Sequence, residues 1–442
     1  METMRRTRVK IVAVAEEPNT PCWPCIDNDV DKVLRRTLKP IIELNPDMDF
    51  DTVVYTQMHQ AEADYENDLK LYDGVLVLVM TCLKDVDKFY AAQAKEGIPT
   101  IIADVPYCGS GSVLPKTVPF IRENKLPVPV LSTLNDAELA EAVKLFDVIA
   151  KMKQTVILSV SNSRRRTLSA ELFNEWGCRF EVRDCKEFIE YMSRVSEEEA
   201  TAIADRWIAE ADEVREASRD DVLESARVHL ALRDMMRDVG AHAVTVDCLS
   251  LSYAGEYGEN RHFYPCLSHF EMLNNGIVAV CESDLCATVS SLIAYYMTGK
   301  QGFVSDPVID TASNQIIYAH CVGSKKAYGV GDTRTCRYAI RSHAEDKRGA
   351  SVQIIFPLGD PITTLMVYPS ERFPATVHTG RAVGNVGLQE ACRSKLAAET
   401  NAERILEKWT GYWHRVTVYG DYRRQFLRLC KMKGLDVVEE DR

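Results

Sequence analysis

Acidic and histidine side chains in the second half of the chain are candidates for acid–base or metal chemistry. Glu282 follows the apolar run Ile277–Cys281, Asp306 lies where a β-rich region begins, and His320 and His414 flank later apolar runs. Two carboxylates and an imidazole that met at one edge of a sheet would form a hard-to-borderline site for a divalent cation. Mn²⁺ or Mg²⁺ would suit this site and would leave open positions for two oxygens of a substrate.

Each of these residues also has a simpler interpretation. Asp284, or less well Glu282, could cap the helix that follows it. Asp306 precedes a proline, and Asp-Pro is typical of an ordinary turn. A histidine beside a tryptophan, such as His414, is more often packed in a core or placed on the surface than bound to a metal. Local sequence therefore leaves the convergence of these side chains open.

Strand and helix signals alternate along the first third of the chain. The expected strands are Val9–Val14, Thr52–Tyr55, Gly74–Met80 and Thr100–Asp104, and the expected helices are Asp29–Leu44, Lys84–Lys95 and Asp136–Met152. This alternation predicts βαβ units and a parallel sheet. We therefore predict an N-terminal α/β domain over residues 1–153.

A second series of alternating signals predicts a second α/β domain over residues 154–299. The expected strands are Thr155–Val160, Arg179–Val182, Ala243–Cys248 and Ile277–Cys281. One helix is expected to start near Leu168, and four more are expected at Glu197–Val214, Asp221–Val239, Pro265–Asn274 and Leu285–Met297. Ligands of open α/β sheets bind beyond the carboxyl ends of the strands. Glu282 lies at such an end.

The chain from residue 300 to residue 442 has a different pattern. Short β segments punctuated by Gly and Pro are expected at Gln315–Val322, Ser351–Phe356, Thr363–Tyr368, Thr376–Thr379 and Arg415–Tyr419, before a last helix at Tyr422–Lys433. They predict a β-rich antiparallel barrel or sandwich that carries Asp306 and His414. The predicted fold class is α/β, with two doubly wound, Rossmann-like parallel-sheet domains followed by this β-rich domain.

Composition argues for a folded protein of the cytoplasm. The 442 residues are 46% hydrophobic and 27% charged, as in ordinary globular proteins. We expect no membrane span, since no apolar run is long enough, and no signal peptide, since the short run Ile11–Ala15 leads into acidic residues. The net charge of −12 argues against nucleic-acid binding. The 14 scattered cysteines indicate reduced thiols.

Several motifs of the second half resemble the L-fucose isomerase and L-arabinose isomerase superfamily. They are Val278–Thr288, Gly302–Asp306, Ala319–Cys321 and Tyr412–Gly420, the last followed by an Arg-Arg-Gln-Phe helix. The resemblance extends to the whole layout, two α/β domains and then a β-rich one, while the first 150 residues match in layout alone. Trp413-His414 stands where many members have two adjacent histidines.

This resemblance implies a function and a role for each matching residue. It implies a metal-dependent aldose–ketose isomerase that works through a cis-enediol, is a homo-oligomer and builds its active sites between subunits. Glu282 and Asp306 would be metal ligands and proton shuttles, and His414 would be the third ligand. His320 would be a fourth ligand or a neighbour that supports the ligands. The implied metal is Mn²⁺, with Mg²⁺ or Co²⁺ as alternatives.

The segment Ser161–Thr167 places Arg164, Arg165 and Arg166 at the start of a helix. Cations there oppose the helix dipole, so they cost stability unless an anion offsets them. They could lie in a solvated loop or pair with acids of a neighbouring subunit. They could also recognise a sugar oxygen, a phosphate or a sulfonate through bidentate contacts. The substrate is therefore expected to be a neutral deoxy or pentose sugar, or an anionic hexose such as sulfoquinovose.

Further residues are candidates for contact with the sugar. Trp23, within Cys22-Trp-Pro-Cys25, could form an aromatic wall, although a CxxC motif also occurs in thiol redox sites. His378 lies two residues before Gly380, in what we expect to be a turn of the β-rich domain. Trp413 is the third candidate, because it adjoins His414.

Two rival functions fit the same residues. One is a non-catalytic sugar-binding or regulatory paralogue, which would have no need of two acids around a metal. The other is a metal enzyme that forms an enediol for epimerisation or retro-aldol cleavage. Metal content and chelator sensitivity distinguish the first rival from an isomerase, and the sequence does not distinguish the second.

Overall fold

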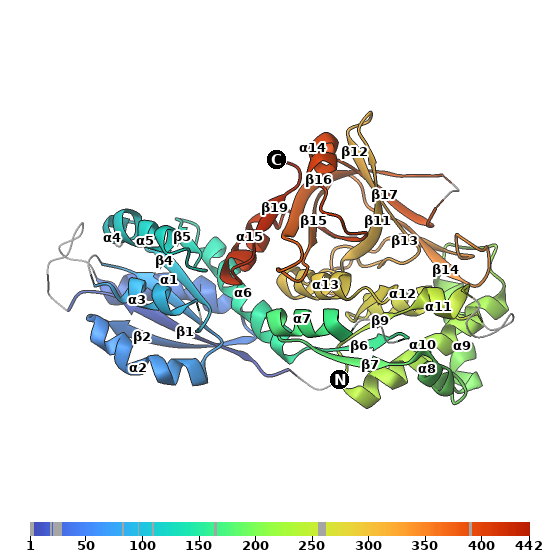
Figure 1. Ribbon diagram of the computed structural model, residues 1–442, viewed down its shortest axis with the longest axis horizontal. Coiled ribbons are helices and arrows are strands. Elements are labelled where there is room, and N and C mark those ends of the chain that lie inside the picture. The colour runs from blue at the N-terminus through green and yellow to red at the C-terminus, as the bar shows by residue number, and fades with distance from the viewer. Residues whose placement is uncertain are drawn as a thin grey trace. The chain divides into compact units, whose positions relative to one another are not determined.

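The computed structural model (Figure 1) describes residues 4–17, 20, 29–81, 84–95, 97–107, 110–162, 166–254, 262–388 and 391–442. The chain forms two compact units. Met4–Lys151 and Arg424–Asp436 belong to one unit, and Met152–Arg423 and Val437–Arg442 belong to the other. Within the described ranges, no helix has the length and hydrophobicity that crossing a membrane requires.

The first unit contains a parallel sheet in the order β2-β1-β3-β4-β5. Its strands are β1 (Thr7–Val14), β2 (Met48–Tyr55), β3 (Gly74–Val79), β4 (Thr100–Asp104) and β5 (Val130–Ser132). The helices of this part of the chain are α1 (Val30–Leu44), α2 (Met58–Leu71), α3 (Val86–Gln93), α4 (Ser110–Ser112), the π-helix η1 (Val113–Thr117), α5 (Val118–Glu123), α6 (Asp136–Gln154) and α15 (Arg423–Met432). The predicted parallel sheet is confirmed.

The second unit contains a further parallel sheet, in the order β10-β9-β6-β7. Its strands are β6 (Val156–Val160), β7 (Arg179–Arg183), β9 (Ala243–Val246) and β10 (Val278–Cys281). The helices are α7 (Arg166–Trp176), α8 (Cys185–Met192), α9 (Glu197–Glu210), α10 (Arg219–Val239), α11 (Cys248–Ser252), α12 (Cys266–Asn274) and α13 (Leu285–Thr298). Strands β6, β9 and β10 are wholly buried, so their apolar side chains form a core with the helices.

The predicted helix Glu197–Val214 is wrong at its end. Helix α9 stops at Glu210, and β8 (Glu213–Arg215) pairs with β13 (Arg337–Arg341), which also pairs with β14 (Ser351–Ile355). This pairing joins positions far apart in sequence, and it outweighs the local helical preference of the segment.

The β-rich part of the second unit is an antiparallel sheet that closes on itself. Its order is β15-β18-β11-β12-β17-β16, and β15 pairs with β16 to complete the ring. The strands are β11 (Phe303–Asp310), β12 (Gln315–His320), β15 (Pro361–Met366), β16 (Ala375–Asn385), β17 (Ser394–Glu399) and β18 (Arg415–Tyr419), with β19 (Val437–Glu439) beside β16 and helix α14 at Ala402–Lys408. The predicted antiparallel β-rich region is confirmed, and the chain has a mixed α/β fold.

Candidate metal centre

Strand register brings two histidines and an aspartate to one end of the barrel. Strands β18, β11 and β12 are neighbours, and Ser305 of β11 pairs with Arg415 of β18. The next residue of β11, Asp306, therefore lies beside the position of His414. Asp306 also pairs with Ala319 of β12, so His320 follows one position later. The three side chains are thus gathered by sheet pairing between distant segments.

Glu282 reaches the same place from the parallel sheet. It follows β10 directly, and its backbone φ of 62° and that of Ser283, 49°, are in the left-handed region. Such a conformation costs a non-glycine residue about 1–3 kcal/mol and persists only where the surroundings hold it. Here Ser283 N–H donates to Val246 O at 3.0 Å, and its hydroxyl donates to Val160 O at 3.1 Å. The ends of β9 and β6 therefore hold the turn that presents Glu282.

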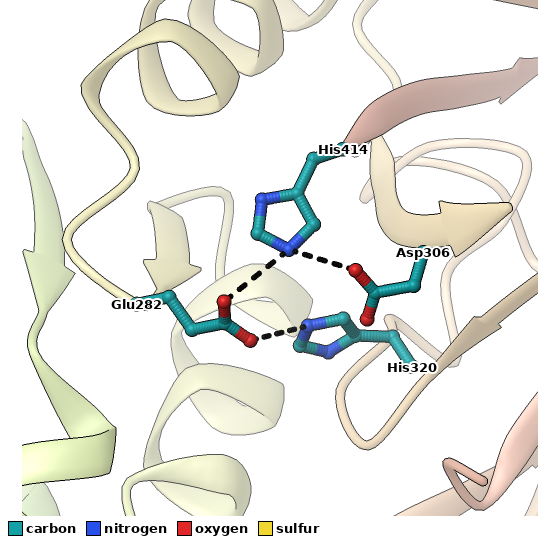
Figure 2. Close-up of side chains that lie close together, drawn as sticks. All are labelled: Glu282, Asp306, His320 and His414. Carbon is teal, nitrogen blue, oxygen red and sulfur yellow. Dashed lines mark ion pairs between the residues drawn. The ribbon is translucent and has the colours of Figure 1, made fainter. Parts of the chain in front are cut away.

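The four side chains converge on one point (Figure 2). One ligand atom from each of Glu282, Asp306, His320 and His414 lies within 4.8 Å of all the others. His414 Nε2 is 3.4 Å from an Asp306 oxygen and 3.7 Å from a Glu282 oxygen, and His320 Nε2 is 3.9 Å from the other Glu282 oxygen. The two rings are buried, while the carboxylates of Glu282 and Asp306 are 28% and 43% exposed.

Asp284 orients His414. One oxygen of Asp284 accepts from Ala287 N–H at 2.8 Å and caps helix α13, and the other lies 2.8 Å from His414 Nδ1. The capping interpretation of Asp284 is thus correct but incomplete. A carboxylate on one ring nitrogen sets the tautomer and aims the other nitrogen at a metal in many metalloproteins. His414 Nε2 accordingly faces Glu282 and Asp306.

Burial and neighbouring charges shift the pKa values of the two acids and the two rings in different ways. Burial raises the pKa of Glu282 and the pKa of Asp306. Burial also lowers the pKa of His320 to about 3, so this ring is neutral. Burial disfavours the charged form of His414 as well, but the hydrogen bond with Asp284 and the nearby carboxylates raise its pKa to about 9. Without a metal ion, a protonated His414 therefore lies beside two carboxylates whose charged forms burial disfavours.

The donor set fits a divalent cation. His414 Nε2 is buried and finds no hydrogen-bond partner among the described residues, although it points into the group. Carboxylate oxygens and imidazole nitrogens together suit divalent cations, and a bound cation would replace the proton of His414. Glu282, Asp306, His320 and His414 could therefore hold a metal ion.

A pocket adjoins this metal centre. It is a partly open hollow, and Glu282, Asp306 and His320 are in its wall. Glu345 and His343 also contribute, so the described lining residues include carboxylates and imidazoles but no lysine or arginine.

Arg415 holds the loop that carries His414. Its fully buried guanidinium donates to the His414 carbonyl at 3.1 Å and to the Tyr412 carbonyl at 3.4 Å, and it lies 2.7 Å from a Glu440 oxygen. It also lies over the Trp409 ring, 3.7 Å from the ring centre. The C-terminal strand β19 and its neighbours thus help to fix the approach to the metal centre.

The prediction that His378 lies in a turn and contacts a sugar is wrong. His378 is 1% exposed and lies within strand β16. Its Nε2 lies 2.7 Å from the Tyr318 hydroxyl, and its Nδ1 lies 2.8 Å from a Glu440 oxygen. Both ring nitrogens are occupied inside the barrel, so this side chain has a structural role beside Arg415.

The remaining predicted sugar contacts differ in how far the structure describes them. Trp23, Arg164 and Arg165 lie outside the described residues, and so does the CxxC motif that contains Trp23. Arg166 is the first residue of helix α7, but its side chain is not among those described. Trp413 is 78% exposed and adjoins His414 in the chain, so its contact with a sugar stays a prediction.

Sequence reasoning missed two features of this region. The first is the hydrogen bond between Asp284 and His414, which are 130 residues apart. The motif around His414 alone could not indicate this contact. The second is a group of cysteines in the pocket wall. Cys281 and Cys321 each adjoin a metal-binding candidate in the chain, and this adjacency is a signal that could have identified them.

We expect Asp284→Asn to weaken Mn²⁺ binding about 10–100-fold, the usual cost of losing a carboxylate that orients a ligand histidine. Asparagine caps a helix about as well as aspartate, so stability should change little. Isothermal titration calorimetry measures the affinity. The matched control is Asp184→Asn, which alters the cap of helix α8 far from the metal-binding candidates in sequence and should leave Mn²⁺ binding unchanged. Equal affinities for the two variants would contradict the role assigned to Asp284.

Comparisons with known proteins do not place the chain in a family. No protein-family model and no curated protein matches it. Two similar solved structures are two-component system response regulator/GGDEF domain proteins, each 13% identical. They cover 54% and 64% of this chain and 81% and 88% of their own, both with a TM-score of 0.26. At that score the likeness carries no argument about fold or function.

Proposed function

We propose that the protein is a metal-dependent aldose–ketose isomerase that moves a sugar carbonyl between C1 and C2 through a cis-enediol. The observation that carries this proposal is the meeting of Glu282, Asp306, His320 and His414 within 4.8 Å beside an open pocket. The resemblance of the surrounding motifs to the fucose and arabinose isomerases supports the same chemistry.

The reaction needs a proton to leave one sugar carbon and return to its neighbour. Glu282 and Asp306 are two carboxylates on one pocket wall, and burial raises the pKa of each, which makes each a stronger proton acceptor than a solvated carboxylate. One carboxylate removes the carbon-bound proton and returns it to the neighbouring carbon. The other carboxylate transfers the hydroxyl proton between the two oxygens. Each such transfer typically contributes about 10²–10⁴-fold to the rate.

The histidines position this machinery. The neutral His320 ring and the His414 ring, held by Asp284, face the two acids and leave the pocket side of the group open. When bound there, a divalent cation such as Mn²⁺ supplies Lewis acidity that stabilises negative charge developing on the two substrate oxygens. A pure binding protein has little reason to place two carboxylates beside two buried imidazoles.

The charged groups that line the pocket indicate which kind of sugar it can accept. Its described charged groups include Glu282, Asp306 and Glu345 but no lysine or arginine, so a neutral deoxy sugar or pentose suits it. A sulfonated or phosphorylated hexose, such as sulfoquinovose, would need cations from elsewhere. The candidates are Arg164, Arg165 and Arg166. We also propose a homo-oligomer with active sites between subunits, on the resemblance alone, and a cytoplasmic location, on the scattered cysteines and the expected lack of a signal peptide.

Proton NMR in D₂O tests the proposed reaction. The full-length protein with Mn²⁺ is incubated with neutral pentoses, deoxyhexoses, and sulfonated and phosphorylated hexoses. We expect ketose formation with deuterium at C1 or C2 for at least one sugar, and its loss after chelation. Epimers or three-carbon fragments instead would indicate one of the rival enediol reactions. Sugar binding without exchange, in protein that holds Mn²⁺, would indicate a non-catalytic paralogue.

A further inference from the structure

A buried glutamine at the start of the barrel lacks hydrogen bonds at both ends of its side chain. Gln301 comes just before β11 and is only 5% exposed. Neither its Nε2 nor its Oε1 bonds to any described residue. A carboxamide can donate two hydrogen bonds and accept two, and reversing the amide would leave both ends without a partner. A buried polar group without hydrogen bonds is costly, so this side chain calls for an explanation.

A small cavity with room for a water molecule adjoins Gln301. The other polar residues of its wall are Ser324, which follows β12, and Thr417 and Tyr419, which belong to β18. The apolar part of the wall includes the ring of Phe303 and that of its aromatic partner Phe356, whose centres are 4.7 Å apart. The polar groups thus reach one cavity from the start of β11, from β18 and from the segment after β12.

Two hydroxyl groups of this wall already donate their protons to other parts of the protein. Ser324 donates to Asn274 Oδ1 at 2.9 Å. Tyr419 donates to the carbonyl of Pro357 at 2.8 Å. A hydroxyl has only one proton, so each of these two oxygens can only accept a hydrogen bond from a molecule in the cavity.

The hydroxyl of Thr417 is in the same state. It lies 2.9 Å from the hydroxyl of Thr364, which itself donates to the Tyr318 oxygen at 2.8 Å. Because Thr364 has no second proton to give, Thr417 is the donor of their shared hydrogen bond. All three hydroxyl oxygens of the wall are therefore acceptors toward the cavity.

These groups define the kind of molecule that the cavity can bind. It must donate hydrogen bonds to the oxygens of the wall, and it must accept one from the amide of Gln301. Water can do both. An ion suits the cavity poorly, because its described lining residues include no charged side chain and burial of an unpaired charge is costly.

We propose that this cavity is a binding site for an ordered water molecule that completes the hydrogen bonding of Gln301. The water accepts from Nε2 of Gln301 and donates to hydroxyl oxygens of the wall. It thereby connects the start of β11 with β18 and with the segment after β12. Buried waters typically make about three hydrogen bonds, and this wall offers that number. The site goes beyond the proposed isomerase function, and it depends on neither the metal nor the sugar.

Thermal unfolding of the full-length Gln301→Met variant tests the proposal by the sign of the change. Methionine is similar in length but cannot bond to the water, so the midpoint should fall by about 2–4 °C, the shift that one lost hydrogen bond produces in a domain of ordinary size. If the cavity held no water, methionine would remove an unbonded buried amide, and the midpoint would rise. A midpoint that rises or does not change would overturn the proposal.

Gln353→Met is the matched control. The amide oxygen of Gln353 accepts directly from Arg341 at 2.7 Å, so this variant loses a hydrogen bond that involves no water, and its midpoint should also fall. A fall for Gln353→Met together with a rise for Gln301→Met would show that the amide of Gln301 is unbonded.

A high-resolution crystal structure of the wild-type protein tests the site even if Gln301→Met does not fold. Electron density should show a water within hydrogen-bond distance of the Gln301 amide and of at least one hydroxyl of the wall. Density for an ion or an organic molecule at this position would overturn the assignment to water. A direct hydrogen bond from the amide to the wall, with no water between them, would overturn it as well.

Discussion

Glu282→Gln is expected to lose isomerisation by at least about 10²–10⁴-fold, because the variant has no carboxylate to move the carbon-bound proton. The fold should survive. Glutamine is close in size to glutamate, and burial already disfavours the charged form of Glu282, as its raised pKa shows. Steady-state kinetics on the sugar that exchanges deuterium, together with thermal unfolding, measures the two effects separately.

Glu345→Gln is the matched control for this variant. Glu345 lies in the same pocket wall, but it is not among the metal-binding candidates. The same chemical change there should reduce turnover less than tenfold, a modest loss beside the 10²–10⁴-fold expected of a group that transfers a proton. Similar losses in both variants would indicate a general effect of pocket charge. Normal turnover by Glu282→Gln would exclude the proposed acid–base role.

The parallel sheets could be predicted from local sequence, because buried strands and the helices between them have distinct patterns. Strand β4 was predicted at Thr100–Asp104 and has those bounds. Glu282 could be placed at a strand end for the same reason. The left-handed backbone of Glu282 could not be predicted from the sequence, because the hydrogen bonds that hold the turn are made with the ends of β6 and β9.

Asp306 shows where local reasoning stops. Its Asp-Pro sequence is typical of a turn, yet it lies within strand β11. Proline is tolerated there because β11 pairs with β18 over Phe303–Ser305, so Pro307 needs no N–H on that side. The order β18-β11-β12 is a long-range property, and it decides whether Asp306, His320 and His414 meet. The motif resemblance, and no local pattern, predicted that meeting.

His378 and Glu440 show a related limit. The glycine after His378 suggested a turn, but β16 continues through it to Asn385. Glu440, at the far end of the chain, is fully buried between His378 and Arg415. Nothing near Glu440 in the sequence indicates a buried charge, because its partners are 25 and 62 residues away.

Glu440→Gln is expected to destabilise the protein by about 3–5 kcal/mol, the cost of removing one partner of a buried ion pair. Arg415 would keep its charge in a site that is closed to solvent, 0% exposed, and His378 would lose its carboxylate partner. Since Arg415 also donates to the carbonyls of the loop that carries His414, Mn²⁺ binding should weaken as well. Chemical denaturation and calorimetric titration measure these two losses.

The pH dependence of stability gives an independent check on Glu440. Burial alone would raise the pKa of this carboxyl, but His378 and Arg415 outweigh burial and lower it. A lowered pKa in the folded state means that the contribution is present above the ordinary glutamate pKa of about 4.3 and is lost as the pH falls below it. The wild type should therefore lose stability in acid, and Glu440→Gln should lose less.

Glu439→Gln distinguishes this effect from a general disturbance of the C-terminal strand. Glu439 is the neighbouring residue and pairs with Arg423 at 2.8 Å, but its side chain is 31% exposed. A partly solvated pair contributes at most about 1 kcal/mol, since water screens it and replaces its hydrogen bonds. We therefore expect a small loss for Glu439→Gln and unchanged Mn²⁺ binding. Equal losses for the two variants would show that the strand, rather than the buried charge, supports the His414 loop.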